Sequence, residues 1–362
     1  MKKSLKNTIF VLLIMITLVF FMFGSIIAPD DELSYSERRK LKQFPNFSFS
    51  TVVNGKFFTE IEDYFLDQFI FRDTFRKLNY IYKTNILLES DSNKAYVVDD
   101  VIYKQEYPLN ESSLNNATDK INEVIKKYLD KMNIYYSIIP DKNYFAPNEY
   151  LKMDYVKFQK IISSNLNLNY INIFDLLEIT DYYKTDIHFK QDMIIDVVNK
   201  LLKKMNNQLI NSSDFTRKDL YPFYGSYYSL VNISSKDTLT YLNSEIIENM
   251  TVYDYEKQKE IDVYDETLFK GMDGYDVYLS GPKPLLTITN NNVDTNKELY
   301  LFRDSFGSSL APLLATKYYK VHLIDLRYIS TNAINNFIEF KENQDVLFIY
   351  STVILNNSFT FK

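Results

Sequence analysis

The sequence predicts an α/β fold, in which helices cover both faces of a parallel sheet. Strand-like apolar runs alternate with helical segments over residues 95–206, and the same alternation returns over residues 293–362. Consecutive parallel strands are usually joined by a helix, so this alternation is typical of a parallel sheet with both faces covered. The chain has 362 residues, which is enough for a large core and about two domains.

The elements of the sheet region follow from the spacing of the apolar residues. Residues 95–104, A-Y-V-V-D-D-V-I-Y-K, predict two short strands around an Asp-Asp turn. Helices are expected at 113–131, 154–164, 190–205, 307–316 and 332–341. Strands are expected at 133–140, 170–175, 299–302, 321–325 and 346–350.

Two further segments precede or interrupt this alternation. Apolar residues recur at helical spacing over 53–84, and F-R-D at 71–73 begins a second helix there. Residues 207–292 are rich in Tyr, Asn and Asp and predict an insertion or small β-subdomain. We therefore expect a cytoplasmic start and anchor at 1–30, a juxtamembrane helical region at 31–94, the two parts of the sheet domain at 95–206 and 293–362, and the insertion at 207–292.

An uncharged apolar run at residues 8–27 is long enough to cross a bilayer as a helix. Three lysines precede the run and three acidic residues follow it, so the positive-inside rule places the N-terminus in the cytoplasm and the rest of the chain outside. A cleaved signal peptide and a buried helix are the alternatives. Signal cores are usually shorter, about 7–15 residues, and Pro29 directly after Ala28 opposes cleavage there. The lysines are Lys2, Lys3 and Lys6.

The composition excludes several kinds of site. The chain has no cysteine, so thiolate metal sites, cysteine nucleophiles and disulfides cannot form. It has only 7 glycines and neither of the glycine-rich phosphate-binding motifs. The net charge of −6 is unlike that of a nucleic-acid-binding protein. We therefore expect no cofactor, no metal and no nucleic-acid partner.

Reactive and charged residues follow three of the predicted strands. P-D-K stands at 140–142, R-D-S-F-G at 303–307 and D-L-R-Y at 325–328. Sites in such sheets lie at the carboxyl ends of the strands. We therefore expect the side chains after these strands to line one cleft, the alternative being solvated loop residues. The residues expected beside Ser305 are Lys142, Asp325, Arg327 and Tyr328.

Ser305 lies between a predicted strand and a predicted helix, which is the context of a nucleophile elbow. The N–H groups at the helix start could stabilise an oxyanion; the alternative is a plain helix N-cap by Asp304 or Ser305. A serine nucleophile needs a base with an orienting carboxylate. His188 is one of two histidines and stands two residues after Asp186, although it could also be a structural histidine. His322 alternates within an apolar strand and is expected to pack there.

These same stretches resemble a known family. T-D-I-H-F at 185–189 resembles the T-D-x-H-W signature of the DHHW family and of the related alginate O-acetylation proteins. The block at 303–328, from R-D-S-F-G to I-D-L-R-Y, and the block at 44–73, from F-P-N-F-S to F-R-D, resemble two further blocks of that family. P-D-K matches a family strand end. The departures are Ile187 for the first histidine of the name-giving motif, Phe189 for its tryptophan, and Arg303 where relatives often have Gly or Lys.

The resemblance implies an SGNH-hydrolase-like fold with a Ser-His-Asp triad. Carried over by position, Ser305 is the nucleophile, His188 the base and Asp186 its orienter. Y-G-S at 224–226 is expected to supply a second oxyanion donor from Gly225 or Ser226.

Relatives transfer or remove acetyl groups on extracellular polysaccharide, beside a multi-spanning membrane acyltransferase. The resemblance thus implies a membrane-anchored, extracytoplasmic O-acetyltransferase or acetylesterase that acts on a cell-surface or exopolysaccharide. Because a sugar hydroxyl or water can resolve the same acetyl-enzyme, the sequence leaves transferase and esterase open. The competing hypothesis is a catalytically degenerate SGNH-like module that binds glycan or scaffolds an export complex.

Overall fold

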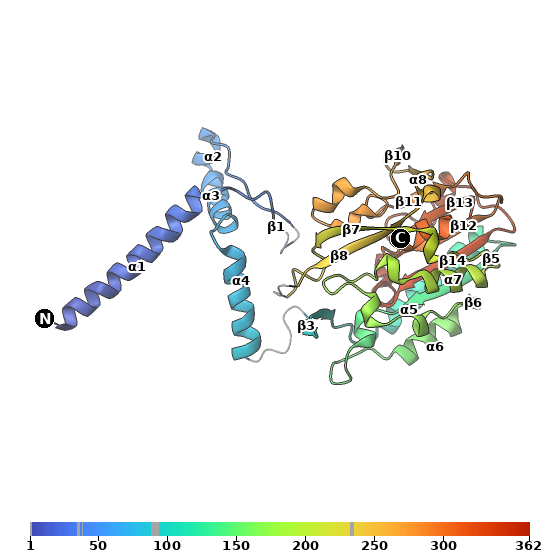
Figure 1. The fold of residues 1–362 in the computed structure, drawn as a ribbon, viewed down its shortest axis with the longest axis horizontal. Helices are drawn as coiled ribbons and strands as arrows, with labels where there is room; N and C mark the ends of the chain where they lie inside the picture. Colours follow the sequence, from blue (N-terminus) through green and yellow to red (C-terminus); the bar gives the residue numbers. More distant parts are fainter. Residues whose placement is uncertain (1, 35–36, 38, 88–93, 232–234) are drawn as a thin grey trace. The chain divides into compact units, whose positions relative to one another are not determined.

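The computed structural model describes residues 2–34, 37, 39–87, 94–231 and 235–362. The chain divides into two compact units, one of residues 1–93 with 228–234 and the other of residues 94–227 with 235–362 (Figure 1). The domain limits expected from the sequence remain predictions.

The first unit is helical. Helix α1 spans Lys2–Ile27 and is long and apolar enough to cross a membrane over Leu5–Ile27. It fits a single-pass anchor or a signal sequence. Lys2 and Lys3, on which the expected orientation partly depends, have side chains outside the described residues. The remaining elements are β1 (Leu33–Ser34), β2 (Arg39–Lys40), α2 (Phe49–Val53), α3 (Lys56–Asp67) and α4 (Arg72–Ile81), which continues into a π-helical turn at Tyr82–Ile86.

The second unit is built on an eight-stranded sheet with the order β10-β9-β11-β13-β12-β14-β5-β6. Strands β13, β12, β14, β5 and β6 are parallel, whereas β11, β9 and β10 are joined by antiparallel pairings. The bounds are β5 Asn133–Ile139, β6 Asn169–Tyr170, β9 Thr251–Asp254, β10 Lys259–Ile261, β11 Leu285–Thr289, β12 Glu298–Arg303, β13 Lys320–Ile324 and β14 Asp345–Ser351.

Helices cover both faces of this sheet because its central strands are apolar on both sides. Leu299 and Leu301 of β12 belong to one core cluster, together with residues of α7 (Ile195–Lys204) and α9 (Gly307–Ala315). Tyr300 and Phe302 of the same strand belong to the other, with residues of α5 (Glu111–Tyr128) and α6 (Tyr155–Asn165). The predicted α/β fold is therefore confirmed, with a mostly parallel sheet. The unit also contains the short helices α8 (Glu245–Glu248) and α10 (Thr352–Leu355).

The two short strands expected around an Asp-Asp turn are present as β3 (Ala95–Val98) and β4 (Val101–Lys104). The turn residues Asp99 and Asp100 have φ of 48° and 64°. This left-handed conformation is the one that two-residue hairpin turns require, and Asp tolerates it better than most residues.

Three sequence predictions of secondary structure were wrong in extent. The expected strand at 170–175 is only Asn169–Tyr170, because the Asn172 side chain accepts the N–H of Phe174 and turns the chain into a 3-10 helix. The expected helix at 332–341 is a single 3-10 turn, Ile334–Asn336, in an asparagine-rich stretch of low helix propensity. The expected helix at 190–205 begins with a separate 3-10 turn, Gln191–Met193, before α7.

Residues 207–292 divide between two sheets. Strands β7 (Thr216–Phe223) and β8 (Asp237–Asn243) form an antiparallel pair of their own. The rest of the segment supplies β9, β10 and β11 to the main sheet. The later strands extend the main sheet outward from β13, since β11 pairs with β13, β9 with β11 and β10 with β9.

Candidate active site

Ser305 lies in the turn between β12 and α9, at the carboxyl edge of the parallel strands. The buried Asp304 accepts the N–H of Phe306 at 3.0 Å with one carboxylate oxygen and the N–H of Ser351 at 2.7 Å with the other. Asp304 therefore fixes the turn and ties it to the end of β14. Asp304 thus makes the capping contact of this turn, and the hydroxyl of Ser305 has a different partner.

The hydroxyl of Ser305 lies within hydrogen-bonding distance of His188. Its Oγ lies 2.8 Å from His188 Nε2, and His188 Nδ1 lies 2.5 Å from Asp186 Oδ1. Asp186 and His188 are buried, whereas Ser305 is half-buried. With Asp186 ionised, Nδ1 carries the proton and Nε2 is left as the acceptor of the serine hydroxyl. The three residues singled out in the sequence are thus brought together in the order that a Ser-His-Asp triad requires.

Asp186 remains a carboxylate although it is buried. Burial by itself would raise its pKa, but the charge and hydrogen bond of His188 oppose this, together with the N–H groups of Ser226 at 2.5 Å and of His188 at 2.9 Å. The balance holds the pKa of Asp186 well below its ordinary range. A permanently charged Asp186 stabilises the protonated imidazole that forms when His188 takes a proton.

The N–H of Ser305 has no hydrogen-bond partner among the described residues. It lies two residues before α9, where N–H groups and the helix dipole favour negative charge. This N–H is therefore the candidate donor for an oxyanion that develops beside Ser305.

Solved structures share this arrangement of strands and helices. A DHHW family protein from Eubacterium siraeum DSM 15702 superposes with a TM-score of 0.59 over 72% of this chain and 91% of its own, at 18% identity. The chain has the fold of a DHHW family protein. The resemblance to that family in the sequence is thus confirmed at the level of the fold.

A second solved structure that this chain resembles is Bacillus cereus PatB1, with a TM-score of 0.60 at 17% identity, over 72% of this chain and 96% of that one. PatB1 with a sulfonyl adduct gives a TM-score of 0.59 at 16% identity, over 72% and 97% of the two chains. No protein-family profile and no curated protein matches the sequence.

Within this DHHW fold, Lys142 holds the loop that carries Asp186 and His188. Its side chain points inward and is only 1% exposed. The ammonium donates to the carbonyl oxygens of Tyr183 at 2.8 Å, Lys184 at 3.0 Å and Asp186 at 3.1 Å. The expectation that Lys142 lines a substrate cleft is therefore wrong, because three backbone carbonyls use all of its donors.

Burial lowers the pKa of Lys142 to about 7, against the opposing charges of Asp186 and Asp237. Below pH 7 the lysine is charged in both the folded and the unfolded chain, so the cost of burying the charge is fully present. Between pH 7 and the ordinary value of 10.5 the folded protein has released this proton and the unfolded chain has not. The contribution of Lys142 to stability therefore rises with pH in this window, by up to about 1.4 kcal/mol per pH unit.

Lys142→Met is expected to destabilise the protein by about 1–3 kcal/mol at pH 9, because the loop carbonyls lose their donor. The loss should be smaller at pH 6.5, where the substitution also removes the cost of the buried charge. Denaturant unfolding of both proteins across this range measures the difference. Lys190→Met, which removes a single bond to the Thr180 carbonyl at 2.9 Å, is the matched control. A destabilisation that does not change with pH would contradict the assignment.

Gly225 and Ser226 support Asp186 and are not free oxyanion donors. The N–H of Gly225 donates to Thr185 Oγ1 at 3.1 Å, and that of Ser226 to Asp186 Oδ2. The expectation of a second oxyanion donor at 224–226 is therefore wrong for these two N–H groups. Asp237 fixes the same loop, because its carboxylate accepts the N–H groups of Lys184 and Thr185 at 3.0 and 2.7 Å.

Gly225→Ala is expected to cost about 1–3 kcal/mol of stability and to lower activity, because an added Cβ overpacks the site. The Cβ would lie 2.3 Å from Asp186 Cβ and 2.4 Å from the Thr185 carbonyl oxygen. Thermal unfolding and kcat measure the two effects. Ser226→Ala is the control, since it keeps the N–H that Asp186 accepts and removes only a hydroxyl 3.4 Å from the Ile187 nitrogen. Equal activity of the two variants would mean that the packing of Gly225 against Asp186 does not position this carboxylate.

Aromatic rings enclose His188. The ring of Tyr275 is stacked on the imidazole with centroids 3.8 Å apart, and Phe306 meets it edge-on at 4.8 Å. The Tyr275 hydroxyl donates to Ser309 of α9 at 2.9 Å. Sequence analysis missed Tyr275, which lies in a 3-10 turn within the 207–292 segment. Phe189, in place of the family tryptophan, is fully buried against Phe306.

The remaining expected residues lie at the same sheet edge but contact one another. Asp325 binds Arg327 through two hydrogen bonds of 2.9 and 2.6 Å. Asp325 Oδ2 also lies 3.8 Å from Nη1 of the fully buried Arg303, just before Ser305. The charged groups of Arg327 and Asp325 therefore neutralise each other. Tyr328 is 45% exposed, so of this group it offers the most side-chain surface to a ligand.

Proposed function

We propose that the chain is a membrane-anchored, extracytoplasmic serine enzyme that transfers or removes acetyl groups on a cell-surface polysaccharide. The observation that carries this proposal is the relay of 2.8 Å from Ser305 to His188 and 2.5 Å from His188 to Asp186. The DHHW fold and the matching sequence blocks support the substrate class.

The reaction follows from the relay. As Ser305 Oγ attacks the carbonyl carbon of an acetyl ester, His188 Nε2 accepts its proton, and Asp186 stabilises the resulting imidazolium. The oxyanion that forms is stabilised by the N–H of Ser305 and the start of α9. Collapse of this intermediate expels the leaving alcohol, which takes the proton from His188. A sugar hydroxyl or a water molecule then attacks acetyl-Ser305, assisted in the same way.

A transferase of this kind needs an acetyl donor outside the cytoplasm. We therefore propose a multi-spanning membrane acyltransferase as the partner that supplies acetyl groups, in line with the family resemblance. Helix α1 would keep the enzyme at the same membrane. The location follows from Lys6 before the apolar run and the acidic residues Asp30, Asp31 and Glu32 after it.

A sulfonyl fluoride distinguishes an active enzyme from a degenerate scaffold. An activated serine displaces fluoride and forms a stable Oγ–S bond, and PatB1 has been solved with a sulfonyl adduct. We expect phenylmethylsulfonyl fluoride to label Ser305, as seen by mass spectrometry, and to label neither a Ser305→Ala nor a His188→Ala variant. Polymer from cells producing Ser305→Ala at normal level should lack acetyl groups. Normal polymer acetylation in those cells would favour the scaffold.

A further inference from the structure

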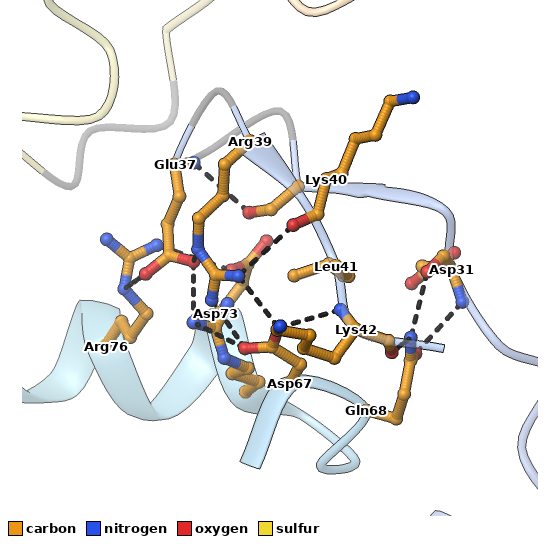
Figure 2. Close-up of polar contacts among 12 residues, drawn as sticks. Asp31, Glu37, Arg39, Lys40, Leu41, Lys42, Asp67, Gln68, Asp73 and Arg76 are labelled. Atoms are coloured by element: carbon orange, nitrogen blue, oxygen red, sulfur yellow. Dashed lines mark hydrogen bonds and ion pairs between the residues drawn. The ribbon is translucent and has the colours of Figure 1, made fainter. Parts of the chain in front are cut away.

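Polar contacts tie the segment that leaves α1 to helix α3. Gln68 donates to the carbonyl oxygens of Asp31 at 2.9 Å and Lys42 at 3.0 Å and accepts the N–H of Asp31 at 3.0 Å. The hydroxyl of Tyr64 donates to Asp30 at 2.9 Å. These contacts, part of which Figure 2 shows, fix α3 to the end of α1.

A cluster of ion pairs joins α3 and α4 to the segment that follows α1. Arg39 binds Asp67 of α3 through two contacts of 2.5 and 2.7 Å (Figure 2). Arg72 of α4 contacts Glu37 at 2.6 Å, and Arg76 contacts it at 3.6 Å. One face of α4 is therefore occupied by charge pairs with the loop after α1.

The junction of α3 and α4 packs against α1 inside its apolar run. The ring of Phe21 lies 5.5 Å from the rings of both Phe69 and Phe75. The N–H of Ile70 donates to Ser25 Oγ at 3.1 Å, and Ser25 is 4% exposed. Phe21 precedes the end of α1 by six residues, or about 9 Å along the helix. If the end of this apolar run marks the edge of the bilayer hydrocarbon, these contacts lie up to about 9 Å inside that edge, a depth that the apolar face of an interfacial helix reaches.

A neighbouring face of α4 is apolar and exposed. Phe75 and Leu78 of α4 and Tyr82 of the turn that follows are spaced by three and four residues, so they share a face. These three residues and Phe71, at the N-cap of the helix, are all exposed. Phe58 and Phe65 of α3 and Phe69, just after this helix, are likewise exposed. The contact of Phe75 and Phe69 with Phe21 shows that both faces lie on the side of α1.

We propose that α3 and α4 form a second membrane-contacting element, whose apolar faces lie in the outer interface of the bilayer that α1 crosses. This inference rests on the proposed anchoring by α1. Lipid is the occupant that the contacts favour, because these faces continue the lipid-facing surface of α1. Aromatic residues on one side of a helix and charges on the other are typical of interfacial helices.

The chain has no tryptophan, so a single substitution provides a unique fluorescent probe of depth. The full chain is reconstituted in phosphatidylcholine vesicles with and without lipid brominated near the top of the acyl chains, which quenches nearby tryptophan. Leu78→Trp and Phe65→Trp probe the proposed faces. Lys77→Trp is the control, because residue 77 is not three or four residues from Phe71, Phe75, Leu78 or Tyr82 and so lies on another side of α4. Phe20→Trp, exposed in α1, tests the anchor itself.

We expect Leu78→Trp and Phe65→Trp to lose at least half as much emission as Phe20→Trp, while Lys77→Trp keeps nearly all of its own. Quenching of Phe20→Trp without quenching of the two probes would overturn the inference and leave the anchor intact. The apolar faces would then be a contact surface for a protein partner. Equal quenching of Lys77→Trp and Leu78→Trp would overturn the proposed orientation. An unquenched Phe20→Trp would reject the anchor, and the inference with it.

Discussion

Ser305→Ala and His188→Ala are each expected to lower kcat for a chromogenic acetyl ester by about a million-fold, since each change disables the same relay. Ser305→Ala removes the atom that attacks the ester. His188→Ala removes the base that lies 2.8 Å from it. The double variant should be no worse than either single variant, because groups that act as a unit are not additive.

The control for this pair is Ser308→Ala, which removes another serine hydroxyl of the same turn and helix. Its kcat is expected to stay within about tenfold of the parent, because its hydroxyl is not part of the relay. Near-normal turnover by Ser305→Ala would show that the ester is cleaved elsewhere. A double variant much worse than both single variants would show that Ser305 and His188 act independently.

Asp186→Asn is expected to lower kcat by about 10⁴-fold and to leave residual activity. The amide keeps the size of the carboxylate, but it favours the imidazole tautomer with the proton on Nε2, which cannot accept a proton from Ser305. The negative charge that stabilises the imidazolium is also lost. KM should change little, because the substitution does not touch the substrate.

Asp186 also contributes to stability, because its folded pKa lies well below the ordinary range. This contribution is present above the unfolded pKa of about 3.9 and disappears only as the pH falls through the folded value. Asp186→Asn should therefore be less stable than the parent at pH 7 and approach it in acid. A loss of kcat below tenfold, with normal folding, would remove Asp186 from the relay.

Several features of the fold could be predicted from local sequence because they depend on local periodicity. The apolar runs of β12 and β14 predict buried strands wherever the chain places them. The predictions of secondary structure were wrong where polar side chains compete for the backbone hydrogen bonds of a strand or helix. Asn172 ends a strand by accepting a backbone N–H, and the asparagines after residue 330 reduce a predicted helix to one turn.

For the candidate site, the scarcity of histidine made the prediction feasible. With two histidines in the chain, a base for Ser305 had to be His188 or His322. His322 lies within β13, with its ring nitrogens 2.9 Å from Thr287 Oγ1 and 3.2 Å from a Glu298 oxygen. It is therefore a packed residue of the sheet, as its place in an apolar strand indicated.

The sequence alone determined which residues could carry the chemistry, because residue type and strand-end position are local properties. It also determined the apolar length of α1 and the strands that build the sheet. Only the tertiary structure decided how the site is held: Lys142 turns inward to three carbonyls, Gly225 approaches Asp186, and Tyr275 stacks on His188. These contacts join residues that are 39 to 87 positions apart in the sequence. Local periodicity does not encode the direction of such side chains, because packing of distant segments sets it.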